Sequence, residues 1–95
     1  MAMDQIVIAR FRSTFEGGRA VLTAELVPRP TMRWRGLCQA NLARYAQAFE
    51  RTPELEADAI VVSTTSREVA TAEMALETLV RVTNQLDAEE LLEPA

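Results

Sequence analysis

Two short segments carry the side chains of this sequence that are best suited to bind an anion. The first contains Arg29, Arg33 and Arg35, and the second contains Ser63, Thr64, Thr65, Ser66 and Arg67. Guanidinium groups form charge-assisted hydrogen bonds with phosphate and carboxylate groups, and hydroxyl groups can donate further ones. Each segment lies where a helix is expected to begin, and the free N–H groups of a helix N-terminus also favour an anion. The sequence therefore predicts a site for a small phosphate- or carboxylate-bearing ligand, provided that the fold brings the segments together.

A second interpretation is that these arginines pair with acidic groups of the same chain. Asp4, Glu54 and the acidic C-terminal tail are the candidate partners, and Thr65 would then only cap its helix. The sequence contains neither a glycine-rich phosphate loop nor another named binding motif to support the anion site. The two interpretations differ in geometry, because only the first needs both segments at one edge of a sheet.

The sequence has few of the side chains that catalysis or metal binding usually requires. The chain has no histidine and no lysine, which removes the commonest general base, the commonest zinc ligand and Schiff-base mechanisms. Its single cysteine, Cys38, lies among apolar positions and is expected to be an inert core residue. We therefore expect no metal, no cofactor and no enzymatic activity. The remote alternative is a small enzyme that works without histidine or lysine.

The charge of the chain is unevenly distributed along its length. Residues 1–51 hold eight arginines and four acidic residues, whereas residues 52–95 hold two arginines and ten acidic residues. This polarity indicates either internal pairing or a charged binding surface. On a helix, Arg33, Arg44 and Arg51 would share one flank, which is a candidate surface for an acidic protein partner or simply a solvated flank. The overall acidity disfavours nucleic acid as a partner.

The first 27 residues predict a β-hairpin whose register can be derived. Residues 5–15 and 19–27 are rich in β-branched and aromatic side chains and flank Gly17-Gly18, which suits a two-residue type I′ turn. One face then pairs Phe15 with Ala20, Ser13 with Leu22, Phe11 with Ala24 and Ala9 with Leu26. The other face pairs Glu16 with Arg19 and Arg10 with Glu25, and also holds Ile6, Ile8, Val21 and Val27. A slip of one residue would destroy this segregation.

A helix is predicted to follow, from an N-cap at Thr31 to about Arg51. Its apolar stripe consists of Trp34, Cys38, Leu42, Tyr45 and Phe49. Trp34 is expected in the core, and the alternative is that it stacks on an aromatic ligand. Gly36 weakens the helix by about 1 kcal/mol relative to alanine, and we expect it to permit close packing on the sheet.

The second half predicts a strand and a helix. An acidic loop at residues 54–58 precedes the apolar strand at residues 59–62, and Thr65 with Glu68 matches a capping box. The stripe of the second helix consists of Val69, Ala72, Leu76, Leu79, Val80, Thr83 and Leu86. Residues 87–95 are expected to be a frayed acidic tail.

These elements predict an α+β domain at residues 1–86 with the order ββαβα. The expected architecture is a two-layer sandwich, in which a three-stranded mixed sheet carries two helices on one face. A helical crossover makes the strands it joins parallel, so we place the second and third strands parallel, with the first strand between them. Both helices would then begin at one edge of the sheet, which is where the anion site is predicted.

The function that fits these features best is a small, non-enzymatic protein-interaction or regulatory module. The uncovered back of the sheet and its free edges predict a homodimer, and the charged surfaces predict an unidentified protein partner. The alternative is the anion-binding domain described above. The N-terminus lacks the pattern of a signal peptide and no apolar run reaches membrane-spanning length, so we expect a cytoplasmic protein without a membrane partner.

Overall fold

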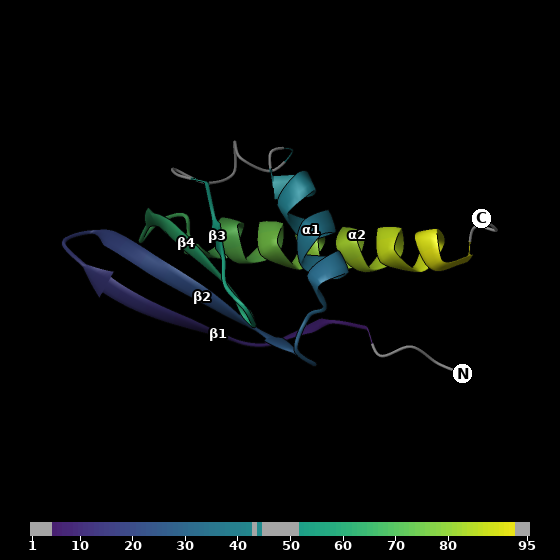
Figure 1. Ribbon diagram of the computed structural model, residues 1–95. Coiled ribbons are helices and arrows are strands. Elements are labelled where there is room, and N and C mark those ends of the chain that lie inside the picture. Colours follow the sequence, from purple (N-terminus) through teal and green to yellow (C-terminus); the bar gives the residue numbers. More distant parts are fainter. Residues whose placement is uncertain (1–4, 43, 45–51, 93–95) are drawn as a thin grey trace.

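The computed structural model describes residues 5–42, 44 and 52–92. Its elements are β1 (Val7–Glu16), β2 (Arg19–Val27), α1 (Met32–Leu42), β3 (Glu54–Leu55), β4 (Ala59–Thr65) and α2 (Val69–Leu92) (Figure 1). The predicted α+β class is confirmed. The predicted three-stranded mixed sheet is wrong, because the sheet has four strands in the order β1-β2-β4-β3 and each neighbouring pair is antiparallel.

The turn at Gly17-Gly18 sets the register of the hairpin that β1 and β2 form. Both glycines have positive φ, 57° and 80°, which side chains with a Cβ rarely adopt. The pairing runs from Glu16 opposite Arg19 to Arg10 opposite Glu25. This part of the predicted register is confirmed.

Beyond Arg10 a β-bulge changes the register. Ile8, and not Ala9, lies opposite Leu26, and Val7 lies opposite Val27. The predicted Ala9–Leu26 pair is therefore wrong, as is the placement of Ile6 and Ile8 on the outer face. The bulge turns the larger apolar side chain inward, since Ile8 packs against the core while Ala9 is exposed. Ile6 is itself buried in the core.

The direction of β4 differs from the prediction, and β3 explains why. β4 runs antiparallel to β2, from Ala59 opposite Glu25 to Thr65 opposite Arg19, so β2 rather than β1 lies inside the sheet. β3 is a two-residue strand within the predicted acidic loop. Because β2 and β3 are both antiparallel to β4, they are parallel to each other. The helical crossover therefore does connect parallel strands, but the strand that it reaches is β3.

One hydrophobic core lies between the inner face of the sheet and the two helices. β2 and β4 contribute alternate residues, among them Leu22, Ile60 and Val62. α2 lies along this face, and α1 packs across α2 (Figure 1). The predicted stripes supply the helical part of the core, with the fully or almost fully buried residues Trp34, Cys38, Leu42, Ala72, Leu76, Leu79, Val80 and Thr83.

The ends of the helices match the predictions in part. The Trp34 amide donates a hydrogen bond to Thr31 Oγ1 (3.1 Å), which confirms the predicted N-cap of α1. Tyr45, Phe49 and Arg51 lie outside the described residues. α2 begins at Val69, where the Glu68 amide donates to the Thr65 carbonyl (3.0 Å), and it continues to Leu92. Residues 87–92 of the predicted tail are therefore helical.

Gly36 does not permit close packing. Gly36 is exposed, and a Cβ atom added to it would have no other atom within 4 Å. The expectation that this glycine lets α1 approach the sheet is wrong. It is a helical position at which alanine would fit.

The buried thiol of Cys38 gives a measurable sign that α1 packs against α2. Its side chain is fully buried, and this burial raises the pKa of the Cys38 thiol to about 11, although a hydrogen bond with Thr83 lowers it in part. The thiol is therefore protonated in the folded protein at pH 10, whereas in the unfolded chain, with a pKa of 9.0, it is largely ionised.

We predict that the free energy of unfolding falls between pH 9 and pH 11 by about 2 kcal/mol more than in a Cys38→Ala variant. Below about pH 8 the thiol is protonated in both states and contributes almost no slope. Urea titrations at pH 8, 9, 10 and 11 measure the difference, and other titrating groups are common to both proteins. Parallel pH profiles for the two proteins would contradict the burial of Cys38.

Candidate interaction surface

β1 is a long strand at the edge of the sheet. It pairs with β2 on one side, and within the part of the chain that the structure describes no strand pairs with its other side. Its ten residues are exposed except for Ile8 and Phe11, which are half-buried. A strand edge of this kind presents a row of N–H and C=O groups that can pair with another strand.

The regular part of this edge has a defined limit at each end of the strand. The bulge between Ile8 and Arg10 limits it at one end, and the Gly17-Gly18 turn limits it at the other. Residues 10–16 lie between them, and Ser13 is the middle residue of this segment. We call residues 10–16 the β1 edge.

The register also determines which backbone groups the β1 edge presents. A two-residue turn is closed by a hydrogen bond between its first and last residues, here Glu16 and Arg19. Because successive residues of a strand direct their backbone groups to opposite sides, Glu16, Thr14 and Arg12 direct theirs to β2. The N–H and C=O groups of Phe15, Ser13 and Phe11 therefore point to the free side.

The inner face of the β1 edge is aromatic and only partly covered. Phe15 is 59% exposed and Phe11 is half-buried, although both are on the face that carries the core. In Figure 1 the tip of the hairpin projects beyond the first turn of α2. The molecule is accordingly elongated, with extents of 50 × 23 × 18 Å. Exposed aromatic area next to free backbone groups is typical of a binding surface.

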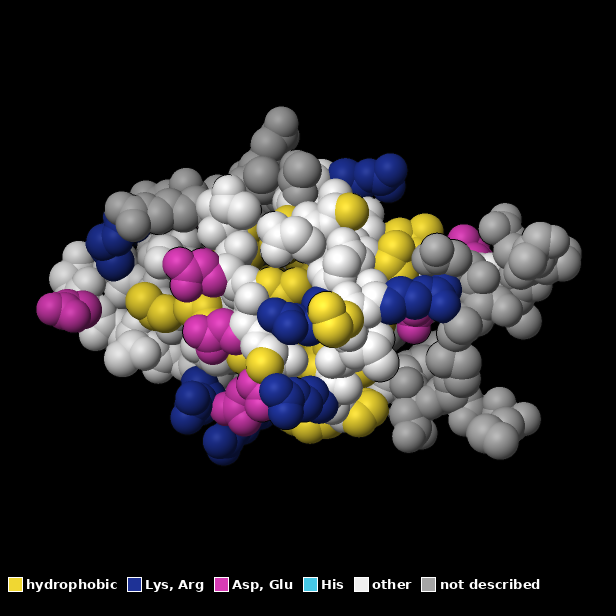
Figure 2. Space-filling model, viewed as in Figure 1, with side chains coloured by type: hydrophobic (Ala, Val, Ile, Leu, Met, Phe, Trp, Pro, Cys, Tyr) yellow, Lys and Arg dark blue, Asp and Glu magenta, His cyan; other side chains and the backbone are white. Residues whose placement is uncertain are grey.

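The outer face of the hairpin is charged. Glu25 Oε2 lies 3.0 Å from Arg10 Nε and 2.8 Å from Arg12 Nε, which confirms the predicted Arg10–Glu25 pair. All three side chains are at least partly exposed, so the ion pairs stabilise the fold by only about 0–1 kcal/mol each. Val7, Val21 and Val27 lie exposed on the same face. Figure 2 shows basic and acidic side chains interspersed rather than gathered into patches of one sign.

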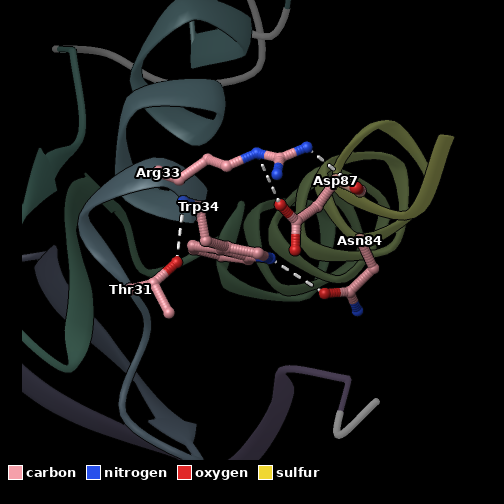
Figure 3. Close-up of polar contacts among 5 residues, drawn as sticks. All are labelled: Thr31, Arg33, Trp34, Asn84 and Asp87. Carbon is pink, nitrogen blue, oxygen red and sulfur yellow. Dashed lines mark hydrogen bonds and ion pairs between the residues drawn. The ribbon is translucent and has the colours of Figure 1, made fainter. Parts of the chain in front are cut away.

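Asn84 fixes the chain segment that leads into β1. Its Nδ2 donates a hydrogen bond to the Ile6 carbonyl (2.7 Å) and its Oδ1 accepts one from the Ile6 amide (3.2 Å). The same Oδ1 accepts a second hydrogen bond, from Trp34 Nε1 (2.9 Å), as Figure 3 shows. One side chain of α2 thus connects the segment before β1 to α1. We call these three residues the Asn84 node.

A groove of about 540 Å³ adjoins the Asn84 node, between α2 and the start of β1. Its floor is apolar, with Ile6, Ile8 and Val80, and charged groups of α2 such as Glu77 and Arg81 stand beside it. This groove contains no group of titratable residues that suggests catalysis, and it lies at the end of the β1 edge where the bulge occurs.

The structure does not bring the two predicted anion-binding segments together. Because β2 and β4 are antiparallel, Arg29, Arg33 and Arg35 follow the end of β2 while Ser66 and Arg67 follow the opposite end of the sheet. The Ser66 amide donates to the Gly18 carbonyl (2.9 Å), next to the hairpin turn. The common rim on which the predicted site depends does not form, since it requires parallel strands.

The individual residues of these segments have different surroundings. Arg33 Nε lies 3.3 Å from Asp87 Oδ1 and its Nη2 donates to the Asp87 carbonyl (3.2 Å), as Figure 3 shows. This is the internal pairing with the acidic C-terminal segment that the second interpretation predicts. Thr64 is fully buried, whereas Ser63 and Thr65 are half-buried. Arg35 is half-buried, and its Nε has no hydrogen-bond partner among the described residues.

The predicted basic flank of the first helix is described only in part. Arg33 forms the ion pair with Asp87, Arg44 is exposed, and Arg51 lies outside the described residues. Trp34 is 2% exposed and donates its indole N–H to Asn84, so it belongs to the core and not to a stacking surface.

Other kinds of site find no candidate in the described residues. Within residues 5–42, 44 and 52–92, no three histidine, cysteine or acidic side chains lie together so that they could hold a metal ion. No helix among them is long and apolar enough to cross a membrane. Comparison of the chain with models of known protein families, with curated proteins and with solved structures finds no match.

The β1 edge and the hydrogen bonds of Asn84 were not predicted from the sequence. The turn and the alternating pattern fix which backbone groups of β1 point away from β2, but the predicted strand order placed the first strand between the other two and so hid the free edge. The only feature of the sequence that indicates the bulge at Ala9 is the larger size of Ile8. Asn84 lies beside the predicted apolar stripe of the second helix, and the sequence does not indicate which groups a polar residue at that position would bond to.

We predict that Asn84→Ala lowers the free energy of unfolding by about 2–4 kcal/mol, because it leaves the Ile6 backbone and the Trp34 indole without their partner. Gln85→Ala is the matched control, since Gln85 is the exposed neighbour on the same groove, and it should change stability by less than about 0.5 kcal/mol. Urea denaturation followed by Trp34 fluorescence measures both. Equal effects of the two substitutions would contradict the Asn84 node.

Proposed function

We propose that this protein is a small, non-enzymatic protein-interaction module that acts as a homodimer, with the β1 edge as its binding element. The observation that supports this proposal is the seven-residue run of regular strand between bulge and turn, with its outward backbone groups uncovered by any described element. Binding by addition of a strand gains affinity from main-chain hydrogen bonds and specificity from alternate side chains.

The side chains of the β1 edge suit this mode of binding. On the inner face, Phe11 and Phe15 offer aromatic surface that burial by a partner would stabilise. On the outer face, Arg10, Arg12 and Glu16 present charges of both signs. Such a pattern favours a partner strand of complementary charge and disfavours indiscriminate pairing of edges.

Protein binding is favoured over anion binding by the arrangement of the arginines. The segments with Arg33 and Arg67 lie at opposite ends of the sheet, and Arg33 is engaged by Asp87. The β1 edge, in contrast, is continuous and exposed. If the protein is regulatory, its own part is to recognise the partner, and the regulated activity belongs to that partner.

We predict that Ser13→Pro converts the dimer into a monomer. Proline removes the outward N–H of Ser13, and a proline at an edge strand is tolerated where that N–H does not contribute to the internal ladder. Sedimentation equilibrium should give twice the chain mass of 10.6 kDa for the wild type and a single chain mass for the variant.

Two control variants separate loss of the edge from loss of the fold. Ser13→Ala keeps the N–H and should remain dimeric. Thr14→Pro removes an amide that points to β2, and it should lower the melting temperature far more than Ser13→Pro does. The proposal fails if the wild type is monomeric at millimolar concentration, or if Ser13→Pro leaves the mass unchanged.

A further inference from the structure

We propose that the β1 edge pairs with the β1 edge of a second copy, antiparallel, across a two-fold axis at Ser13. This inference rests on the proposed function, because it specifies the partner and the register of the same edge. The resulting sheet would be continuous across the dimer, with the two β1 strands side by side at its centre and β3 at both ends.

The position of the axis follows from the limits of the regular segment. When a two-fold axis relates two antiparallel copies of a strand, each residue lies opposite the partner's residue that is equally far from the axis in the other direction along the sequence. Ser13 is the midpoint between the bulge at Ala9 and the turn at Gly17, so this axis pairs all of residues 10–16 with the same residues of the partner. The outward N–H and C=O of Ser13 can then bond to those of the partner's Ser13, as required for a hydrogen-bonded pair.

Charges on the outer face match in this register. Arg10 lies opposite the partner's Glu16, and the symmetry produces this pair twice. Arg12 lies opposite the partner's Thr14, so no like charges meet. These positions form non-hydrogen-bonded pairs, in which the side chains of facing strands lie closest to each other.

Aromatic side chains match on the inner face. Phe11 lies opposite the partner's Phe15, again twice, and the four rings would form one cluster across the axis. Phe15 is 59% exposed in the single chain although it is on the face that carries the core. Cross-strand aromatic pairs are among the favourable ones in antiparallel sheets, and the cluster gives Phe15 the cover that α2 does not supply.

Neighbouring registers are worse for definite reasons. An axis at Arg12 places this arginine opposite the partner's Arg12, and an axis at Phe11 places Arg10 opposite the partner's Arg12. An axis at Thr14 leaves only residues 12–16 paired and sets Phe11 against the partner's Gly17. The axis at Ser13 is the one that pairs the whole segment without a like-charge contact.

The test uses two charge reversals, each of which should prevent self-association while their mixture restores it. Arg10→Glu places two acidic pairs at the interface, and Glu16→Arg places two basic pairs there. Each variant alone should dimerise at least about tenfold more weakly than the wild type. In the mixture, Glu at position 10 faces Arg at the partner's position 16, and the wild-type Glu16 faces the wild-type Arg10, so a heterodimer should form with nearly wild-type affinity.

The matched control is a mixture of Arg12→Glu with Glu16→Arg. Arg12 Nε also pairs with Glu25 Oε2, from the position opposite Thr23, so each arginine variant loses one ion pair to Glu25 within the chain. The control mixture should not recover, because position 12 faces Thr14 and not Glu16. Native mass spectrometry with one variant isotope-labelled counts the heterodimers, and circular dichroism verifies that each variant is folded.

The outcomes separate this inference from the proposed function. A dimeric wild type whose two mixtures behave alike overturns the register but leaves the interaction module intact. Recovery in the control mixture alone would move the axis to Thr14, which also overturns the inference. A monomeric wild type overturns both proposals.

A crosslinking measurement does not depend on charge reversal. Cys38 is buried, so Ser13→Cys introduces the one readily accessible thiol. A short bismaleimide should link two Ser13→Cys chains efficiently, because the two sites meet at the axis. Ser66→Cys, at the hairpin tip, should link poorly, and equal yields at the two positions would contradict the axis.

Discussion

The positive φ angles at Gly17 and Gly18 determine the register of the hairpin, and through it the composition of both faces of the sheet. They permit a two-residue turn, and that turn fixes Glu16 opposite Arg19. From this pair onward, the alternation of a strand decides which side chains enter the core and which backbone groups face outward. A shift of one residue would put Arg10 and Arg12 on the same face as Leu22 and Ala24, so that the core face would have to accept the arginines or lose the apolar residues of β2.

The other end of β1 is fixed by the hydrogen bonds between Asn84 and Ile6. There the chain has left the regular ladder at the bulge, and the Asn84 amide occupies both polar groups of Ile6 as a neighbouring strand would. The Trp34 indole shares the same Oδ1, so the position of β1 is coupled to the packing of α1 on α2. The turn and the Asn84 node thus fix the two ends of β1, and the β1 edge lies between them.

Much of the local structure could be predicted from the sequence, because it depends on neighbouring residues. The hairpin register from Arg10 to Glu16, the Thr31 cap and the apolar stripes of both helices follow from period, turn type and capping chemistry. The sheet topology could not be predicted in the same way. β3 contains only Glu54 and Leu55, too few residues for a strand pattern, and missing it reversed the direction assigned to β4.

That one omission also accounts for the failure of the predicted anion-binding rim. Because β4 runs antiparallel to β2, the arginines that follow β2 and Arg67, which follows β4, lie at opposite ends of the sheet. The tertiary pairs Arg33–Asp87 and Asn84–Ile6 join positions far apart in the chain, and a single sequence contains no periodicity that would reveal them. The turn determines from the sequence that Ser13 directs its amide away from β2, but only the strand order shows that β1 is an edge strand.

Amide hydrogen exchange as a function of protein concentration can show whether two chains associate through the β1 edge, because it reports on each backbone N–H of β1 separately. The Arg12 and Thr14 amides, which point to β2, should be protected at every concentration. The Phe11, Ser13 and Phe15 amides should exchange rapidly in dilute protein and become protected as the concentration rises through the dissociation constant. Exchange of these three amides that stays rapid in concentrated protein, or protection that spares Ser13, would contradict self-association through the β1 edge.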